Sequence, residues 1–163
     1  NNHFKMEKKM KAFQDYYPDD ISHCYGCGRL NEHGLQIKSY WDGEESVARL
    51  VPNENYIAIP GFVYGGLIAS LIDCHSTGTA AAAKYREQER KMDTKPVIRY
   101  VTASLKVDFL APTPLGVELE IRGRVVEIGE KKVIVEAKVL AENTLCAKGK
   151  VVAVLMPKTM LKK

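Results

Sequence analysis

The stretch Tyr64-Gly-Gly-Leu-Ile-Ala-Ser-Leu-Ile-Asp73 decides how this sequence is interpreted. Two glycines open an apolar helix, and an acid, Asp73, follows about two turns later. Burying a charged group in an otherwise hydrophobic helix costs folding free energy, so such a group is normally paired with another group or has a function. The glycines let a ligand or another backbone approach the helix N-terminus, where free N–H groups point outward. A helix end that polarises a carbonyl and a nearby carboxylate are two parts that acyl-transfer chemistry needs.

The predicted helix has two distinct faces, because successive residues turn by about 100°. Asp73 lies on a face of small residues, and the opposite face carries large apolar residues that we expect to pack on a sheet. The small face holds Gly66, Ala69, Ser70, Thr77 and Ala80, and the large face holds Leu67, Ile68, Leu71 and Ile72 beside His75. Asp73 could accept a hydrogen bond from Ser70 or Thr77 in a helix–helix contact. We favour a general base or nucleophile in a confined cleft.

The order of elements is a hairpin, one long helix and an antiparallel meander. A short amphipathic helix is expected before them, over residues 5–17. The predicted strands cover 35–41, 46–51, 97–110, 117–128, 133–140 and 145–156, and the long helix covers 65–90. Without an alternating βα pattern, a doubly wound parallel sheet is not expected. The pattern indicates an α+β fold in which a curved antiparallel sheet covers one long central helix.

Length and composition fit a single globular domain of modest charge. The chain has 163 residues, 45% of them hydrophobic and 27% charged, with a net charge of +4. That charge suits an anionic small molecule and does not demand nucleic acid. The apolar stretch 65–83 is interrupted by Asp73 and His75, so it is not expected to span a membrane. The N-terminus lacks the apolar core of a signal peptide, so we expect a cytoplasmic protein with free thiols.

The cysteines raise the question of a metal. His23, Cys24, Cys27 and His33 could supply four zinc ligands, but no second cysteine pair follows them. The glycines between them favour a turn-rich loop, so we predict no metal and no cofactor. Cys74 and His75 point in different directions on a helix, which argues against a Cys–His nucleophilic pair. Cys146 is expected to pack in the core.

Three segments in order resemble the hotdog-fold acyl-CoA thioesterases, in particular the phenylacetate-pathway and THEM-like branch. Asp73 follows Gly65 by eight residues, the spacing of that family's helix motif. The stretch from Thr102 to Gly116 is similar to its strand and Pro-x-x-x-Gly turn, and Cys24-Tyr-Gly-Cys-Gly resembles the start of one part of the branch. The resemblance covers roughly residues 24–156. Tyr64 and Ala58 are departures, because relatives carry His and Asn there.

The resemblance implies a role for each matching residue. Asp73 would be the base or nucleophile that brings water to a thioester carbonyl, and the Gly65 N–H would polarise that carbonyl. Thr102 would hold the water, a task that Thr77 could share, and Tyr64 would offer a hydrogen-bond donor. The resemblance also implies paired chains with the site between them, so that Asp73 and Thr102 could come from different subunits.

Substrate binding would involve the helix N-terminus and basic residues near the helix C-terminus. Gly66 and Thr77 would also contact the substrate. Arg90 and Arg99, within a segment rich in lysine and arginine, could hold the phosphates of coenzyme A.

We therefore expect residues 1–20 to be a helical extension and residues 21–158 to be a hotdog thioesterase domain. The expected reaction converts an acyl-CoA to a carboxylic acid and free coenzyme A. A homodimer, or a tetramer made of two dimers, would cover the open sheet edges. The alternatives are a non-catalytic acyl-CoA sensor, favoured by Tyr64 and Ala58, a hydroxyacyl-thioester dehydratase, and a metal-binding interaction domain built on Cys24 and Cys27.

Overall fold

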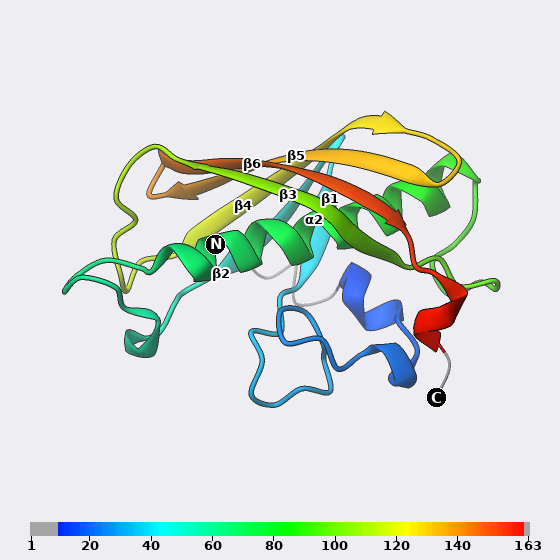
Figure 1. The fold of residues 1–163 in the computed structure, drawn as a ribbon, viewed down its shortest axis with the longest axis horizontal. Helices are drawn as coiled ribbons and strands as arrows, with labels where there is room; N and C mark the ends of the chain where they lie inside the picture. Colours follow the sequence, from blue (N-terminus) through cyan, green and yellow to red (C-terminus); the bar gives the residue numbers. More distant parts are fainter. Residues whose placement is uncertain (1–9, 162–163) are drawn as a thin grey trace.

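The computed structural model describes residues 10–161, which form one long α-helix against a six-stranded antiparallel sheet (Figure 1). The strands are β1 (Ser39–Asp42), β2 (Glu45–Leu50), β3 (Tyr100–Phe109), β4 (Leu119–Ile128), β5 (Lys132–Ala141) and β6 (Thr144–Leu155). The helix is α2 (Gly65–Glu87), and short 3-10 turns are η1 (Phe13–Tyr16), η2 (Asp19–Ile21), η3 (Glu54–Tyr56) and η4 (Lys158–Leu161).

The sheet order is β1-β2-β4-β5-β6-β3, which corrects one part of the predicted meander. Tight turns join β4 to β5 and β5 to β6, as expected. β3 does not pair with β4; it pairs antiparallel with β6 and lies at the sheet edge, while β4 pairs with β2. The connection from β3 to β4 contains Pro112, Pro114 and Gly116, so it does not close a short hairpin. β3 therefore becomes a long edge strand.

α2 packs its large face on the sheet, as its sequence predicts. Leu67, Ile68, Leu71 and Ile72 are buried, and β5 and β6 turn alternate small and β-branched residues towards them. The helix ends at Glu87, slightly before the predicted end, where Glu89 adopts a positive φ of 53°. This arrangement is the hotdog fold that the resemblance implies. In the described part of the chain, no helix combines the length and hydropathy needed to cross a membrane.

The described part of the expected amphipathic helix, residues 10–17, packs into the core but does not form an α-helix. The part of that predicted helix before residue 10 lies outside the described residues. Within the described part only η1 forms, followed by Pro18. Phe13 and Tyr17 are buried, so this segment is held by its apolar side chains. It lies on the other side of α2 from β5 and β6, shown in blue in Figure 1.

A buried polar network joins this segment, the hairpin and the helix. His75 contacts the hydroxyl of Ser39 through Nδ1 at 2.8 Å and that of Ser46 through Nε2 at 2.9 Å. The Gln14 amide donates to Ser39 Oγ at 3.0 Å, and Thr79 contacts Ser46 at 2.6 Å. Complete burial lowers the pKa of His75 to about 4. The imidazole is therefore neutral near neutral pH and links three elements of the core.

We predict that folding stability falls as the pH drops from 6.5 towards 4, because His75 protonates more readily in the unfolded chain. The contribution of neutral His75 to the free energy of unfolding is fully present above pH 6.5, the ordinary pKa of histidine. It is lost as the pH falls towards about 4, the pKa of His75 in the folded chain. Between about pH 7.5 and about pH 5 the histidine accounts for a loss of about 2 kcal/mol. Urea unfolding at the two pH values measures it.

His75→Gln removes the titrating group while leaving a polar side chain, so its pH-dependent loss should be smaller than that of the wild type. His33→Gln, which alters an exposed histidine, should keep the full loss. An equal loss in wild type and His75→Gln would mean that another group is responsible.

Candidate functional site

Asp73 and Thr102 meet at the junction of α2 and the edge strand β3. The Thr102 hydroxyl donates a hydrogen bond to Asp73 Oδ1, and both residues are half-buried. A register shift in the β3–β6 pairing falls between Thr102 and Ser104, and such bulges often aim a side chain at a site. The contact lies within one chain. The expectation that these two residues come from different subunits is therefore wrong.

The neighbouring hydroxyls of the small face do not reach Asp73. Ser70 Oγ donates to the carbonyl of Gly66 at 2.8 Å, and Thr77 Oγ1 donates to that of Cys74 at 3.2 Å. Both bonds lie within the helix. Asp73 therefore does not accept the hydrogen bond from Ser70 or Thr77 that a purely structural role would have used. In residues 10–161, the hydrogen bond found for the carboxylate is the one to Oδ1, so Oδ2 has no hydrogen-bond partner among these residues.

The N-terminus of α2 has no side-chain cap. Tyr64 is the N-cap residue, and no side-chain hydrogen bond is made there. The first backbone N–H groups of an α-helix have no partner within the helix, so those of Gly65 and Gly66 are available to a ligand. A Cβ on Gly65 would lie 3.1 Å from the Phe109 ring, and one on Gly66 would lie 2.3 Å from the Tyr64 ring. The tyrosine ring therefore folds back over Gly66.

Gly65 and Asp73 of one chain are too far apart to act together on one carbonyl group. Eight residues separate them, which is about 12 Å along the axis at about 1.5 Å per residue. Side chains lean towards the helix N-terminus, but this shortens the gap only in part. A reacting carbonyl needs the donor and the base each within about 3 Å. The two groups of one helix therefore cannot serve the same carbonyl.

Two tyrosines that the sequence did not single out lie beside Tyr64. Tyr56 comes from η3 and Tyr25 from the loop that carries the first two cysteines. Burial, together with the nearby phenols of Tyr25 and Tyr64, raises the pKa of Tyr56. No periodicity or motif pointed to this cluster, because its three members come from segments that only the fold brings together. Tyr64, the N-cap residue of α2, connects this cluster to the helix N-terminus.

The two predicted phosphate-binding arginines are engaged within the chain. Arg90 donates to Thr94 Oγ1 at 3.2 Å and its guanidinium lies over the Tyr85 ring, at the opposite end of α2 from Gly65. Arg99 donates to the carbonyl of Tyr100 at 2.9 Å and lies over the Tyr17 ring. Their role in substrate binding stays a prediction, and these contacts give both a structural task.

Three cysteines come together where the sequence offered two cysteines and two histidines. The Sγ atoms of Cys24, Cys27 and Cys74 all lie within 4.8 Å of one another. Within the described residues, neither His23 nor His33 joins this group. Hydrogen bonds from the Cys27 and Cys74 thiols lower the pKa of Cys24, and the bond to Cys24 raises the pKa of Cys27 to about 11. From the sequence, Cys74 was considered only as a partner of His75, because Cys74 is distant in sequence from the two loop cysteines.

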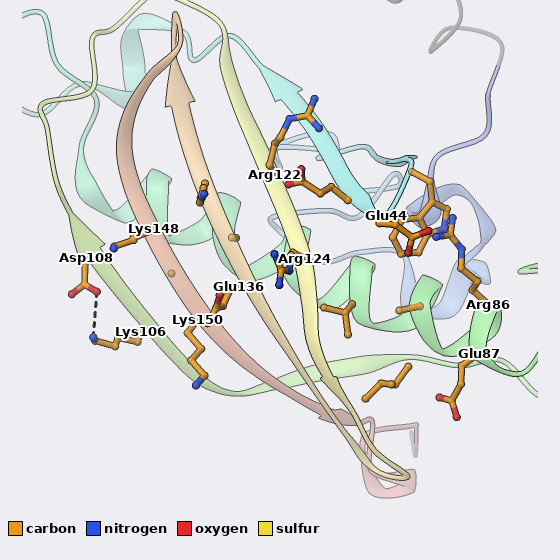
Figure 2. Close-up of a pocket in the computed structure, with 18 residues that line it drawn as sticks. Glu44, Arg86, Glu87, Lys106, Asp108, Arg122, Arg124, Glu136, Lys148 and Lys150 are labelled. Atoms are coloured by element: carbon orange, nitrogen blue, oxygen red, sulfur yellow. Dashed lines mark ion pairs between the residues drawn. The ribbon is translucent and has the colours of Figure 1, made fainter.

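A large hollow lies on the outer face of the sheet, away from Asp73. Its volume is about 980 Å³, and Figure 2 shows charged side chains of β3, β4, β5 and β6 around it. The strand register aligns Arg122 with Lys138 and Lys138 with Lys148, so like charges are neighbours. Neither Gly65, Asp73 nor Thr102 lines this hollow. It is a charged surface separate from the candidate site.

The chain is similar to proteins of one family. The family described as "Thioesterase superfamily" matches residues 60–148, which include the whole of α2, with Gly65 and Asp73, and Thr102 of β3. No curated protein matches the sequence.

Solved structures show the same fold. A thioesterase superfamily protein from Shewanella loihica PV-4 is 48% identical, with a TM-score of 0.66, and the match covers 86% of this chain and 100% of that one. The Escherichia coli PaaI protein from the phenylacetic acid degradation operon is 15% identical, with a TM-score of 0.61 over 76% of this chain and 81% of that one. A Streptococcus mutans UA159 protein bound to acetyl CoA is 20% identical, with a TM-score of 0.60 over 78% of this chain and 96% of that one.

Proposed function

This chain belongs to the thioesterase superfamily, and we propose that it hydrolyses acyl-CoA thioesters with Asp73 as its catalytic carboxylate. The observation that carries the proposal is the hydrogen-bonded pair of Asp73 and Thr102 at the open edge of the fold. A carboxylate with one oxygen held by a hydroxyl and the other without a hydrogen-bond partner in the described residues suits the activation of a water molecule. The Streptococcus mutans neighbour bound to acetyl CoA supports coenzyme A as the carrier.

The proposed reaction needs no group beyond the chain's own residues and water. Asp73 Oδ2 accepts a proton from a water whose oxygen attacks the thioester carbonyl carbon. The Gly65 N–H donates to the oxyanion that develops on the carbonyl oxygen. The intermediate collapses with cleavage of the C–S bond, and the coenzyme A sulfur leaves with the proton that Asp73 held. Direct attack by the carboxylate, with water cleaving the resulting anhydride, is the alternative use of the same residue.

We infer that two chains form each site. The separation of about 12 Å between Gly65 and Asp73 means that the donor and the base acting on one carbonyl come from different helices. An antiparallel approach of two copies of α2 would bring Gly65 of each towards the partner's Asp73. The small residues of this helix face, Gly66, Ala69 and Ser70, favour such a close approach.

The sheet supports the same pairing. β3 is a ten-residue edge strand, and long open edges are normally covered. Leu105, Phe109 and Leu110 are exposed on or just after it. Phe62 and Tyr64, before the helix, add apolar area at the same end. A second copy of this chain would cover both the open edge of β3 and these exposed apolar side chains. A tetramer of two such dimers stays a prediction.

The two rival activities make different demands on the residues near Asp73. A hydroxyacyl-thioester dehydratase needs a histidine to move protons, but His75 is buried with both ring nitrogens hydrogen bonded to serines. An acyl-CoA sensor needs binding without turnover. The Tyr64 ring, folded over Gly66 beside the uncapped N–H groups, is the observation that favours this second candidate.

We predict that Asp73→Asn lowers kcat for thiol release by about 10² to 10⁴, the usual contribution of a general base, without loss of fold. The assay follows coenzyme A released from a panel of acyl-CoAs over many turnovers, so that the signal exceeds the protein's own thiols. Asp108→Asn makes the same change on the outer face of β3 and should leave kcat unchanged.

Two outcomes would contradict the proposal. The first is unchanged thiol release in Asp73→Asn. The second is binding of acyl-CoA by the wild type with no release across the panel, which is the behaviour of the sensor.

We predict that Gly65→Pro lowers kcat by about 10² to 10³, the loss typical of one missing oxyanion donor. Proline is tolerated at the first helical position, where it removes only an unpaired N–H. Tyr64, at ψ 146°, already has the backbone conformation that precedes proline. The measurement is kcat beside the melting temperature.

Gly65→Ala is the matched control, because it keeps the N–H and adds a Cβ against the same Phe109 ring. It should lose much less activity than Gly65→Pro. Equal losses in the two variants would mean that crowding at Phe109, not the missing donor, is responsible.

A further inference from the structure

We propose that Cys24, Cys27 and Cys74 form a binding site for a thiophilic divalent cation, and that Zn²⁺ is the ion that suits it. Two of the ligands come from one loop, and the third comes from α2. No metal was expected from the sequence, because no second cysteine pair follows Cys24 and Cys27 and the glycines near them favour a turn-rich loop. The proposal is independent of thioester hydrolysis and adds a second site beside the first.

The spacing of the sulfurs matches zinc coordination. Cys24 Sγ and Cys74 Sγ are 3.8 Å apart, and all three sulfurs lie within 4.8 Å of one another. Zinc–sulfur bonds of about 2.3 Å in a tetrahedron place neighbouring sulfurs about 3.8 Å apart. The three thiols thus approximate one face of a tetrahedron, and none of them is in a disulfide.

The loop is built so that its sulfurs face the helix. A Cβ on Gly26 would lie 2.2 Å from Cys74 Sγ, so only glycine lets the loop come this close. The Gly28 N–H donates to the carbonyl of Cys24 at 2.7 Å, which closes the turn between the two loop cysteines. The Ile37 N–H donates to the carbonyl of Gly26 at 3.0 Å and anchors the loop to the chain before β1. These bonds fix the ligands before an ion arrives.

The surroundings balance the charge of a divalent ion. Three thiolates and one Zn²⁺ carry a net charge of −1. Arg99 supplies the compensating charge, with Nη2 3.9 Å from Cys27 Sγ. Its guanidinium is held in place by the Tyr17 ring at 4.5 Å and the carbonyl of Tyr100. A monovalent ion would leave a second negative charge without a partner in this buried place.

A water molecule would supply the fourth ligand. Among residues 10–161, no other histidine, cysteine, aspartate or glutamate joins the group. Cys24 is exposed, whereas Cys27 and Cys74 are buried, so a water molecule can complete the tetrahedron from the side of Cys24. A bound ion would hold the loop, and with it Tyr25, against α2 one residue from Asp73.

The test is metal titration of the reduced, chelator-treated full chain under anaerobic conditions. Co²⁺ should bind at one equivalent per chain with the near-ultraviolet absorption of cobalt–thiolate bonds, and Zn²⁺ should displace it. Cys24→Ser and Cys74→Ser should each weaken Zn²⁺ binding by more than about 100-fold, beyond the loss typical of groups outside the coordination shell. Cys24 is exposed, so its variant is expected to stay folded, which circular dichroism verifies.

Two controls separate this site from other thiol chemistry. Cys146→Ser changes a buried cysteine outside the group, and the double variant His23→Gln, His33→Gln removes the histidines near the loop; both should bind as the wild type does. The proposal is overturned if the wild type binds neither ion, if a folded Cys74→Ser variant binds normally, or if the histidine variant loses binding.

Discussion

The rotation of α2 about its own axis is the constraint on which the rest of this structure depends. Burying four large apolar residues on the sheet fixes that rotation, because any turn of the helix would expose them to water. Successive residues then point about 100° apart. Asp73, Cys74 and His75 consequently face three different surroundings: the edge strand, the cysteine loop and the buried serines of the hairpin.

These three neighbours carry three separate tasks. His75 ties the hairpin and the N-terminal segment to the helix through uncharged hydrogen bonds in the core. Cys74 meets the loop that also brings Tyr25 to the helix N-terminus. Asp73 is left half-buried at the sheet edge, where Thr102 orients its carboxylate. The helix thus brings a structural group, a candidate metal ligand and a candidate base within one turn.

Much of this could be predicted from the sequence, because it depends on local pattern. The burial of the large face of α2 and the turns around β5 are encoded by residues close to one another, and both expectations are confirmed. The small face is less open than expected, because Thr77 and Ala80 are buried. The pairing of β3 with β6, the burial of Phe13 and the meeting of Cys74 with Cys24 depend on contacts between distant segments. Periodicity does not report such contacts. Arg99 is another example. Its charge predicted that it binds the phosphates of coenzyme A, but the fold places it against Tyr17 and Cys27.

Each catalytic site, we infer, draws its carboxylate and its oxyanion donor from different chains. Co-expression of Asp73→Asn and Gly65→Pro chains with two different affinity tags, followed by isolation of the mixed dimer, tests this arrangement. One of the two sites in that dimer then combines an intact Asp73 with an intact Gly65 of the partner chain, so the account predicts about half of the wild-type kcat per dimer. If the mixed dimer is as inactive as its parents, both groups act within one chain, and sites shared between chains are ruled out.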